Sequence, residues 1–69
     1  MANISNNDRL FISASSMGDH FYNYIGTGVG SLMEIVNMVK EHPSAPHGMV
    51  TLTVRNASKG WMQSRALYI

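Results

Sequence analysis

Residues 49–69 read MVTLTVRNASKGWMQSRALYI, and this stretch decides the fold. Two runs rich in β-branched and aromatic residues flank residues 56–60, NASKG, a pattern typical of a β-hairpin. Gly60 supplies the positive φ that a loop of this kind needs. The register that best separates apolar from polar side chains pairs Val54 with Met62, Leu52 with Ser64 and Val50 with Ala66.

In this register the two faces of the hairpin differ in chemistry. One face holds the three pairs above together with Tyr68, is mostly apolar, and is expected to pack against the core. The other face carries polar and amphipathic side chains, namely Thr51, Thr53, Arg55, Trp61, Gln63 and Arg65. Arg55 and Trp61 would then lie opposite each other, where a cation–π contact is worth about 0.5–1 kcal/mol.

An earlier hairpin is predicted from the strand-like residues 9–15 and 20–25, with Gly18 and Asp19 as a two-residue turn. That turn pairs Ser15 with Tyr22 and Ser13 with Tyr24. One face then holds Phe11, His20, Tyr22 and Tyr24, and the core face holds Leu10, Ile12, Ala14, Phe21 and Ile25. The register depends on the turn, because a slip of one residue exchanges the faces of one strand relative to the other.

Residues 31–42 are predicted to form an amphipathic helix. Ser31 followed by Glu34 is a capping box, and apolar residues recur behind it at helical spacing: Leu32, Ile35, Val36 and Val39. Pro43 ends the helix. A single helix can cover only one face of a sheet.

The expected fold is therefore α+β. Two hairpins form a small four-stranded antiparallel sheet in the order ββαββ along the chain, with the helix packed on one face. Residues 8–69 form one domain, and residues 1–7, polar and aperiodic, are expected to be a flexible N-terminal arm.

Composition narrows the class of protein. The chain has 69 residues and no cysteine, so its core is small and no disulfide or thiolate metal site can stabilise it. Small domains without such supports often self-associate, and a homodimer is expected. The formal net charge of +1 is too small to indicate nucleic acid or an anionic membrane. No apolar run is long enough to span a membrane and the N-terminus lacks a secretory pattern, so we expect an intracellular, cytoplasmic location.

No motif indicates catalysis, a cofactor or a metal. The glycine-rich residues 26–31 precede a helix but match neither nucleotide-binding spacing, so a flexible connection is the simpler interpretation. Three histidines, His20, His42 and His47, and the dispersed carboxylates do not form a recognisable site. We therefore predict no enzyme activity, no cofactor and no metal.

The face away from the helix is the predicted functional surface, because tyrosine, tryptophan and arginine are enriched at binding hot spots. The predicted partner-binding residues are Tyr22, Tyr24, Arg55, Trp61 and Arg65. They indicate a non-enzymatic protein-interaction module, an inhibitor or adaptor, binding through this face or a free strand edge. Very short cysteine-free domains are common among phage-encoded regulators of host proteins, which would place this one in the host cytoplasm.

Three alternatives remain at this stage. The same aromatic and basic side chains could bind single-stranded nucleic acid by stacking bases and neutralising phosphates. The chain could instead be a structural subunit of a homo-oligomer. The aromatic residues could also be present only because they favour strands.

Overall fold

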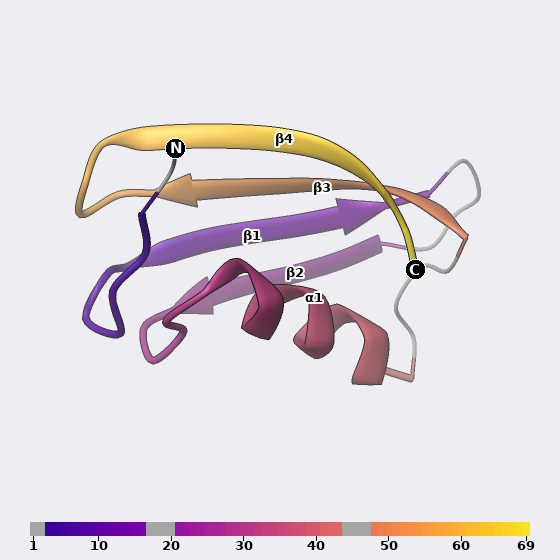
Figure 1. Cartoon of the computed structure of the whole chain (residues 1–69), viewed down its shortest axis with the longest axis horizontal. Coiled ribbons are helices and arrows are strands. Elements are labelled where there is room, and N and C mark those ends of the chain that lie inside the picture. The colour runs from indigo at the N-terminus through magenta and orange to yellow at the C-terminus, as the bar shows by residue number, and fades with distance from the viewer. Residues whose placement is uncertain (1–2, 17–20, 44–47) are drawn as a thin grey trace.

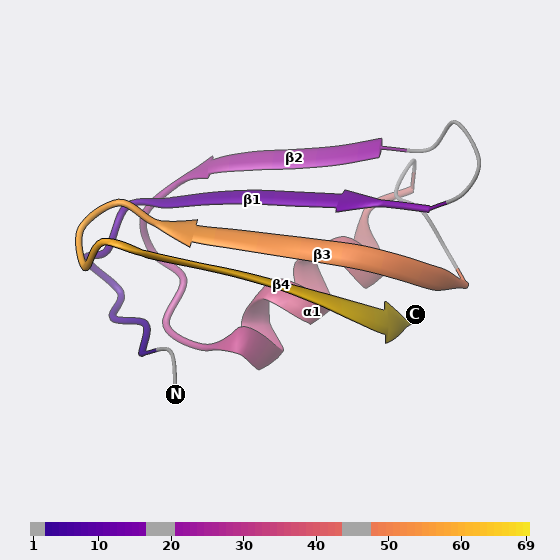
Figure 2. The same cartoon turned by 90° about the horizontal axis from the view of Figure 1, so that it is seen from above.

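The computed structural model describes residues 3–16, 21–43 and 48–69. Along the chain they form five elements: β1 (Leu10–Ser15), β2 (Phe21–Gly26), α1 (Leu32–Glu41), β3 (Met49–Asn56) and β4 (Trp61–Tyr68) (Figure 1). The strands make one antiparallel sheet in the order β2-β1-β3-β4, which is clearest from above (Figure 2). The predicted α+β fold with a ββαββ order is confirmed.

The helix begins and ends close to the predicted positions. Ser31 is the N-cap, and its hydroxyl oxygen accepts a hydrogen bond from the Glu34 backbone amide at 3.2 Å. The Glu34 carboxylate accepts from the backbone amide of Gly30 at 2.9 Å, one residue before the position expected in a capping box. His42 is the C-cap.

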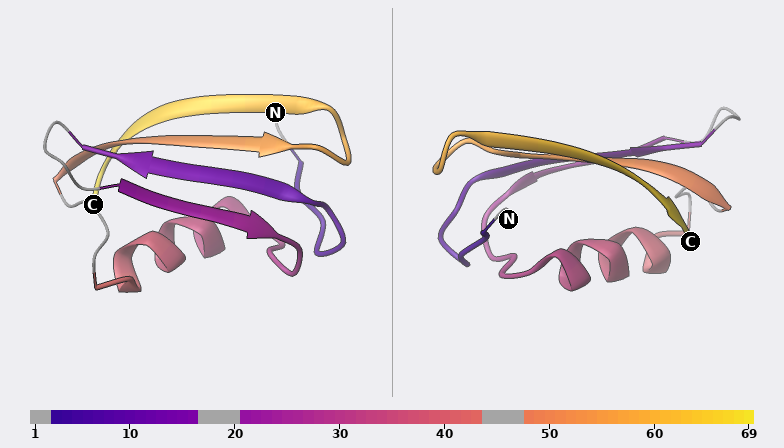
Figure 3. Two further views of the ribbon diagram at one scale, coloured as in Figure 1. Left: turned by 180° about the vertical axis from the view of Figure 1, so that it is seen from behind. Right: turned by 45° about the horizontal axis from the view of Figure 1, so that its top comes forward.

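The core lies between α1 and one face of the sheet, and no described element covers the other face (Figure 3). Alternate residues of the two central strands supply most of it, because successive side chains in a strand point to opposite faces. The buried apolar residues are Leu10, Ile12 and Ala14 of β1, Val50, Leu52 and Val54 of β3, Ile35 and Val39 of α1, and Val29.

The predicted register of the first hairpin is wrong by one residue. Ser15 pairs with Phe21 and Ala14 with Tyr22, so Tyr22 and Tyr24 share the helix-covered face with the core. Phe21 and Ile25, expected in the core, lie on the opposite face. The Gly18-Asp19 turn on which the prediction rested lies outside the described residues.

A physical reason for this register lies in the position of β2 at the edge of the sheet. At this edge the tyrosines on the helix side are half-buried rather than buried. Tyrosine suits such a position because its ring packs while its hydroxyl reaches a polar partner. The Tyr22 ring meets the His42 ring edge-on at 5.1 Å between centroids, and the Tyr24 hydroxyl donates to the Thr27 carbonyl at 3.2 Å.

The predicted register of the second hairpin is also wrong by one residue. Val54 pairs with Gln63 rather than Met62, and Asn56 pairs with Trp61. Trp61, Gln63 and Arg65 therefore lie on the helix side of the sheet. The residues expected beside the core on β4, namely Met62, Ser64, Ala66 and Tyr68, lie on the side away from α1.

Asn56 accounts for this shift because it belongs to the strand and not to the loop. It is fully buried, and its side-chain amide donates to the Asp8 carboxylate at 2.7 Å. The side-chain carbonyl oxygen of Asn56 accepts a hydrogen bond from the Lys59 backbone amide at 2.9 Å and so closes the turn. The loop is one residue shorter than predicted, and Gly60 has the expected positive φ of 76°.

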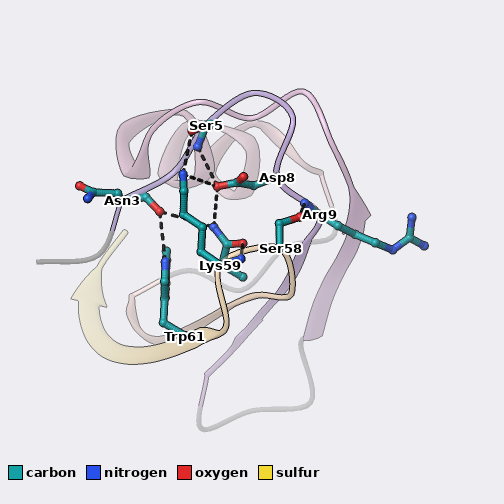
Figure 4. Close-up of polar contacts among 8 residues, drawn as sticks. Asn3, Ser5, Asp8, Arg9, Ser58, Lys59 and Trp61 are labelled. Atoms are coloured by element: carbon teal, nitrogen blue, oxygen red, sulfur yellow. Dashed lines mark hydrogen bonds and ion pairs between the residues drawn. The ribbon is translucent and has the colours of Figure 1, made fainter.

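The N-terminal segment is attached to this turn (Figure 4). The Asp8 carboxylate accepts from Asn56, from the Lys59 ammonium at 2.8 Å and from the Ser5 backbone amide at 3.0 Å. The Trp61 indole donates to the Asn3 carbonyl at 3.1 Å. Asn3 and Ser5 are thus hydrogen-bonded to residues of the β3–β4 hairpin, and the predicted flexibility of residues 1–7 stays a prediction.

Candidate functional site

We call the sheet surface away from α1 the open face. The strand registers arrange its side chains in rows that run across the sheet. The first row is Ile25, Phe11, Arg55 and Met62; the second is Asn23, Ser13, Thr53 and Ser64; the third is Phe21, Ser15, Thr51 and Ala66; and Met49 with Tyr68 lies beyond them.

Large apolar side chains are concentrated on the open face. The exposed ones in the described residues are Met33 on the helix and five on this face: Phe21 (58%), Ile25 (59%), Met49 (61%), Met62 (67%) and Tyr68 (82%). A full aromatic side chain covers about 150–250 Å², so Phe21 and Tyr68 alone leave roughly 200–300 Å² accessible. Apolar surface gathered in this way is typical of interaction sites, whereas scattered apolar residues are not.

One cation lies among these side chains. The Arg55 guanidinium carbon is 5.3 Å from the centre of the Phe11 ring, directly across the β1–β3 ladder. This cation–π pair replaces the one predicted between Arg55 and Trp61. Arg55 is exposed, so its charge faces solvent on the open face.

The second row consists of small polar residues. It separates the apolar side chains of the first row from the exposed Phe21, Met49 and Tyr68. Its hydroxyl groups are partly satisfied within the sheet, since Thr53 and Ser64 are hydrogen-bonded at 2.9 Å between side-chain oxygens. A shallow depression of about 320 Å³ lies between this row and the first one, bordered by Phe11, Ile25, Asn23, Thr53, Arg55 and Met62. The open face therefore combines a shallow depression with exposed apolar side chains.

Of the five predicted partner-binding residues, the structure places only Arg55 on the open face. Tyr22 and Tyr24 lie on the helix side of β2, and burial, with a smaller effect of Tyr24, raises the pKa of the Tyr22 phenol. Trp61 and Arg65 lie on the helix side of β4. The predicted placement on the face away from the helix is therefore wrong for four of the five residues, and a role of any of them in partner binding stays a prediction.

Trp61 and Arg65 line a groove on the helix side, beside the N-terminus of α1. It measures about 310 Å³, and its other walls are Asn3, Ile4, Gly30, Ser31, Leu32, Leu52, Val54 and Gln63. Within the described residues, every buried side-chain nitrogen and oxygen has a hydrogen-bond partner, so no orphaned polar group marks a ligand position here.

The glycine-rich connection before α1 does not present free amides to an anion at two of its positions. The Gly30 amide donates to the Glu34 carboxylate, and the Gly28 amide donates to the Asn6 carbonyl at 2.7 Å. The protein's own carboxylate thus occupies the helix N-terminus that a phosphate would need.

Metal-binding side chains do not cluster in the described part of the chain, where no three of His, Asp and Glu converge. Two of the histidines considered above, His20 and His47, lie outside the described residues. Within the ranges 3–16, 21–43 and 48–69, no helix is long and apolar enough to cross a membrane.

No family model, curated protein or solved structure matches this chain.

Proposed function

We propose that the protein is a non-enzymatic interaction module, an inhibitor or adaptor, that binds another protein through the open face. The observation that carries the proposal is the concentration of five exposed large apolar side chains on that one surface. The partner is a protein with an apolar surface that also bears a carboxylate able to pair with Arg55.

Side-chain chemistry supports a protein partner in two ways. Aromatic rings such as Phe21 and Tyr68 bury a large area while losing little conformational entropy. The flexible thioethers of Met49 and Met62 adapt to an irregular partner surface. Binding of such a surface responds weakly to salt, because few charges take part.

The distribution of charge favours a protein over a nucleic acid. Among the described residues of the open face, Arg55 is the only charged one. Lys59 pairs with Asp8 at the β3–β4 turn, and Arg65 lies on the other side of the sheet. Affinity for nucleic acid depends on the number of phosphates that cations neutralise, and the open face offers one cation.

The proposal is tested by placing a photoreactive phenylalanine analogue at Phe21, and in a separate variant at Met33. Met33 is 73% exposed on the helix and serves as the matched control. We expect the variant with the analogue at Phe21 to cross-link to a protein that the variant with the analogue at Met33 does not capture. The cross-linked protein is then purified and its affinity measured directly.

Substitutions in the purified complex decide the outcome. We expect Phe21→Thr combined with Met62→Thr to weaken binding at least about tenfold, because hot-spot truncations cost more than about 1 kcal/mol each. Met33→Thr should leave the affinity unchanged. Equal loss with both variants, or binding that persists in the double variant, would show that the open face is not the site.

A further inference from the structure

β4 forms one edge of the sheet, with β3 on its inner side and no described strand beyond it (Figure 2). It runs for eight residues, Trp61–Tyr68, without proline, and Arg65 is its one charged residue. Proteins usually protect long edges with prolines, several charges or bulges, because an open edge pairs with other strands.

The backbone groups that β4 directs outward can be identified from its ladder. Gly48 and Ile69 exchange two backbone hydrogen bonds at 2.8 Å each, which makes them a hydrogen-bonded pair. Such pairs alternate along an antiparallel ladder, so Trp61, Gln63, Arg65 and Leu67 direct their backbone groups toward β3. The amides and carbonyls of Met62, Ser64, Ala66 and Tyr68 therefore point away from the sheet.

We propose that two copies of the chain pair antiparallel through β4, with the two-fold axis at Ser64, and so form one continuous sheet. Ser64 then faces Ser64 of the partner subunit, and Met62 faces the partner subunit's Ala66. Each of these residues directs its backbone groups outward, so each pair exchanges two backbone hydrogen bonds. An isologous contact of this kind closes as a dimer and does not propagate.

The side chains of β4 favour this register over the registers in which the two-fold axis lies at Arg65 or Ala66. With the axis at Ser64, Arg65 lies opposite Gln63 of the partner subunit, whose amide oxygen can accept from the guanidinium. Trp61 lies opposite the partner subunit's Leu67, and both are half-buried apolar side chains in the single chain. An axis at Arg65 would put two guanidinium groups opposite each other, which is destabilising. An axis at Ala66 would put Arg65 against leucine.

The pairing has a consequence for the open face. The second row of the open face ends at Ser64 and would continue into the second row of the other copy. The two open faces would then lie side by side. The dimer would then present two copies of the proposed binding surface in a fixed relation, which increases avidity for a partner that has two sites. The pairing itself does not depend on the proposed function.

The chain has no cysteine, so a single introduced cysteine reports the register without background. At a hydrogen-bonded antiparallel pair the Cα atoms are about 5.5 Å apart, within the range that a disulfide spans. Ser64→Cys should therefore cross-link to its copy under mild oxidation. Met62→Cys is the control, because its own copy would lie four residues away, at roughly 13 Å.

The solution mass is measured by light scattering over a range of protein concentrations. We expect twice the monomer mass of 7.6 kDa for the unmodified chain. Ser64→Pro removes an amide that does not take part in the β3–β4 ladder, so the monomer should fold. We expect it to weaken the dimer at least about 100-fold, because the pair at the axis is lost and the ring blocks strand pairing.

If Ser64→Pro fails to fold, Ser64→Lys gives a second test, since it places two ammonium groups face to face at the axis. A monomer at millimolar concentration overturns the proposal. Equal cross-linking of Ser64→Cys and Met62→Cys also overturns it. A dimer that survives both substitutions and cross-links through the analogue at Phe21 places the second copy on the open face. That result would reject the edge pairing and leave the open face in use by self-association.

Discussion

The Asn56 side-chain amide donates to the Asp8 carboxylate at 2.7 Å in a site that water barely reaches, across 48 residues of the chain. This contact joins the segment before β1 to the last residue of β3. Because Asn56 is held there, β3 continues through it, and the register of β4 follows. This register decides which side chains of β4 lie on each face of the second hairpin.

Stability should fall in acid because of Asp8. Hydrogen bonds from Lys59, Asn56 and the Ser5 amide lower the pKa of Asp8 from 3.8 to about 2. The folded state therefore favours the ionised carboxylate. Its contribution is complete above pH 3.8 and is lost as the pH falls toward 2. Thermal unfolding of the wild type and of Asp8→Asn between about pH 5 and about pH 2 checks this. The melting temperature of the variant should fall less over that range than that of the wild type.

Asn56→Ala should lower the free energy of unfolding by about 1–3 kcal/mol, because it leaves the Asp8 carboxylate without one of its buried donors. The turn also loses the acceptor for the Lys59 amide. Urea unfolding measures the change. Asn37→Ala, on an exposed helix position, is the matched control and should change stability by less than about 0.5 kcal/mol. Equal effects of the two substitutions would contradict the role given to Asn56.

The elements of this fold follow from local signals in the sequence. The capping box at Ser31, the apolar spacing behind it and the strand-like runs predict every element, and Gly60 marks the last turn. These signals depend only on residues near one another in the chain. They also predict that the one helix covers only one face of the sheet.

The registers could not be obtained in the same way. The second one depends on Asn56 meeting Asp8, a contact between distant residues that appears in no local pattern. In β4 both alternating sets contain apolar residues, Trp61 with Leu67 and Met62 with Tyr68, so hydrophobicity alone does not choose between them. The only local hint was that Asn56 and Lys59 can form a side-chain-closed turn, which makes the loop one residue shorter.

Leu52→Ala should lower the free energy of unfolding by about 2–4 kcal/mol, because Leu52 is 2% exposed at the centre of the core. Met33→Ala removes a side chain of similar size that is 73% exposed, and should change stability by less than about 0.5 kcal/mol. Denaturant unfolding of both variants checks the difference. Similar values would mean that Leu52 does not pack beneath α1.

Tyr24→Ala combined with Trp61→Ala should destabilise the protein. If the two rings lay on the open face, the fold would tolerate their loss. The structure places both rings on the helix side, half-buried against the core. The Trp61 indole also donates a hydrogen bond to the Asn3 carbonyl. Phe21→Thr with Tyr68→Thr, two exposed rings of the open face, is the matched pair and should unfold at nearly the wild-type urea concentration. If the first pair is the more tolerated, the two rings lie on the open face and both strand registers are shifted by one residue.

Gly60→Ala should cost about 1 kcal/mol and Gly60→Asn less than that. Gly60 has φ of 76°, where a Cβ atom is unfavourable, while asparagine tolerates this conformation better than other residues. A Cβ atom at this position would meet nothing within 4 Å, so the cost is conformational and not steric contact with the rest of the fold. Chemical denaturation of the two variants separates the effects. Equal losses would show that the side chain is obstructed, whereas no loss in either would show that the turn does not require a left-handed residue and that the β3–β4 register is set without it.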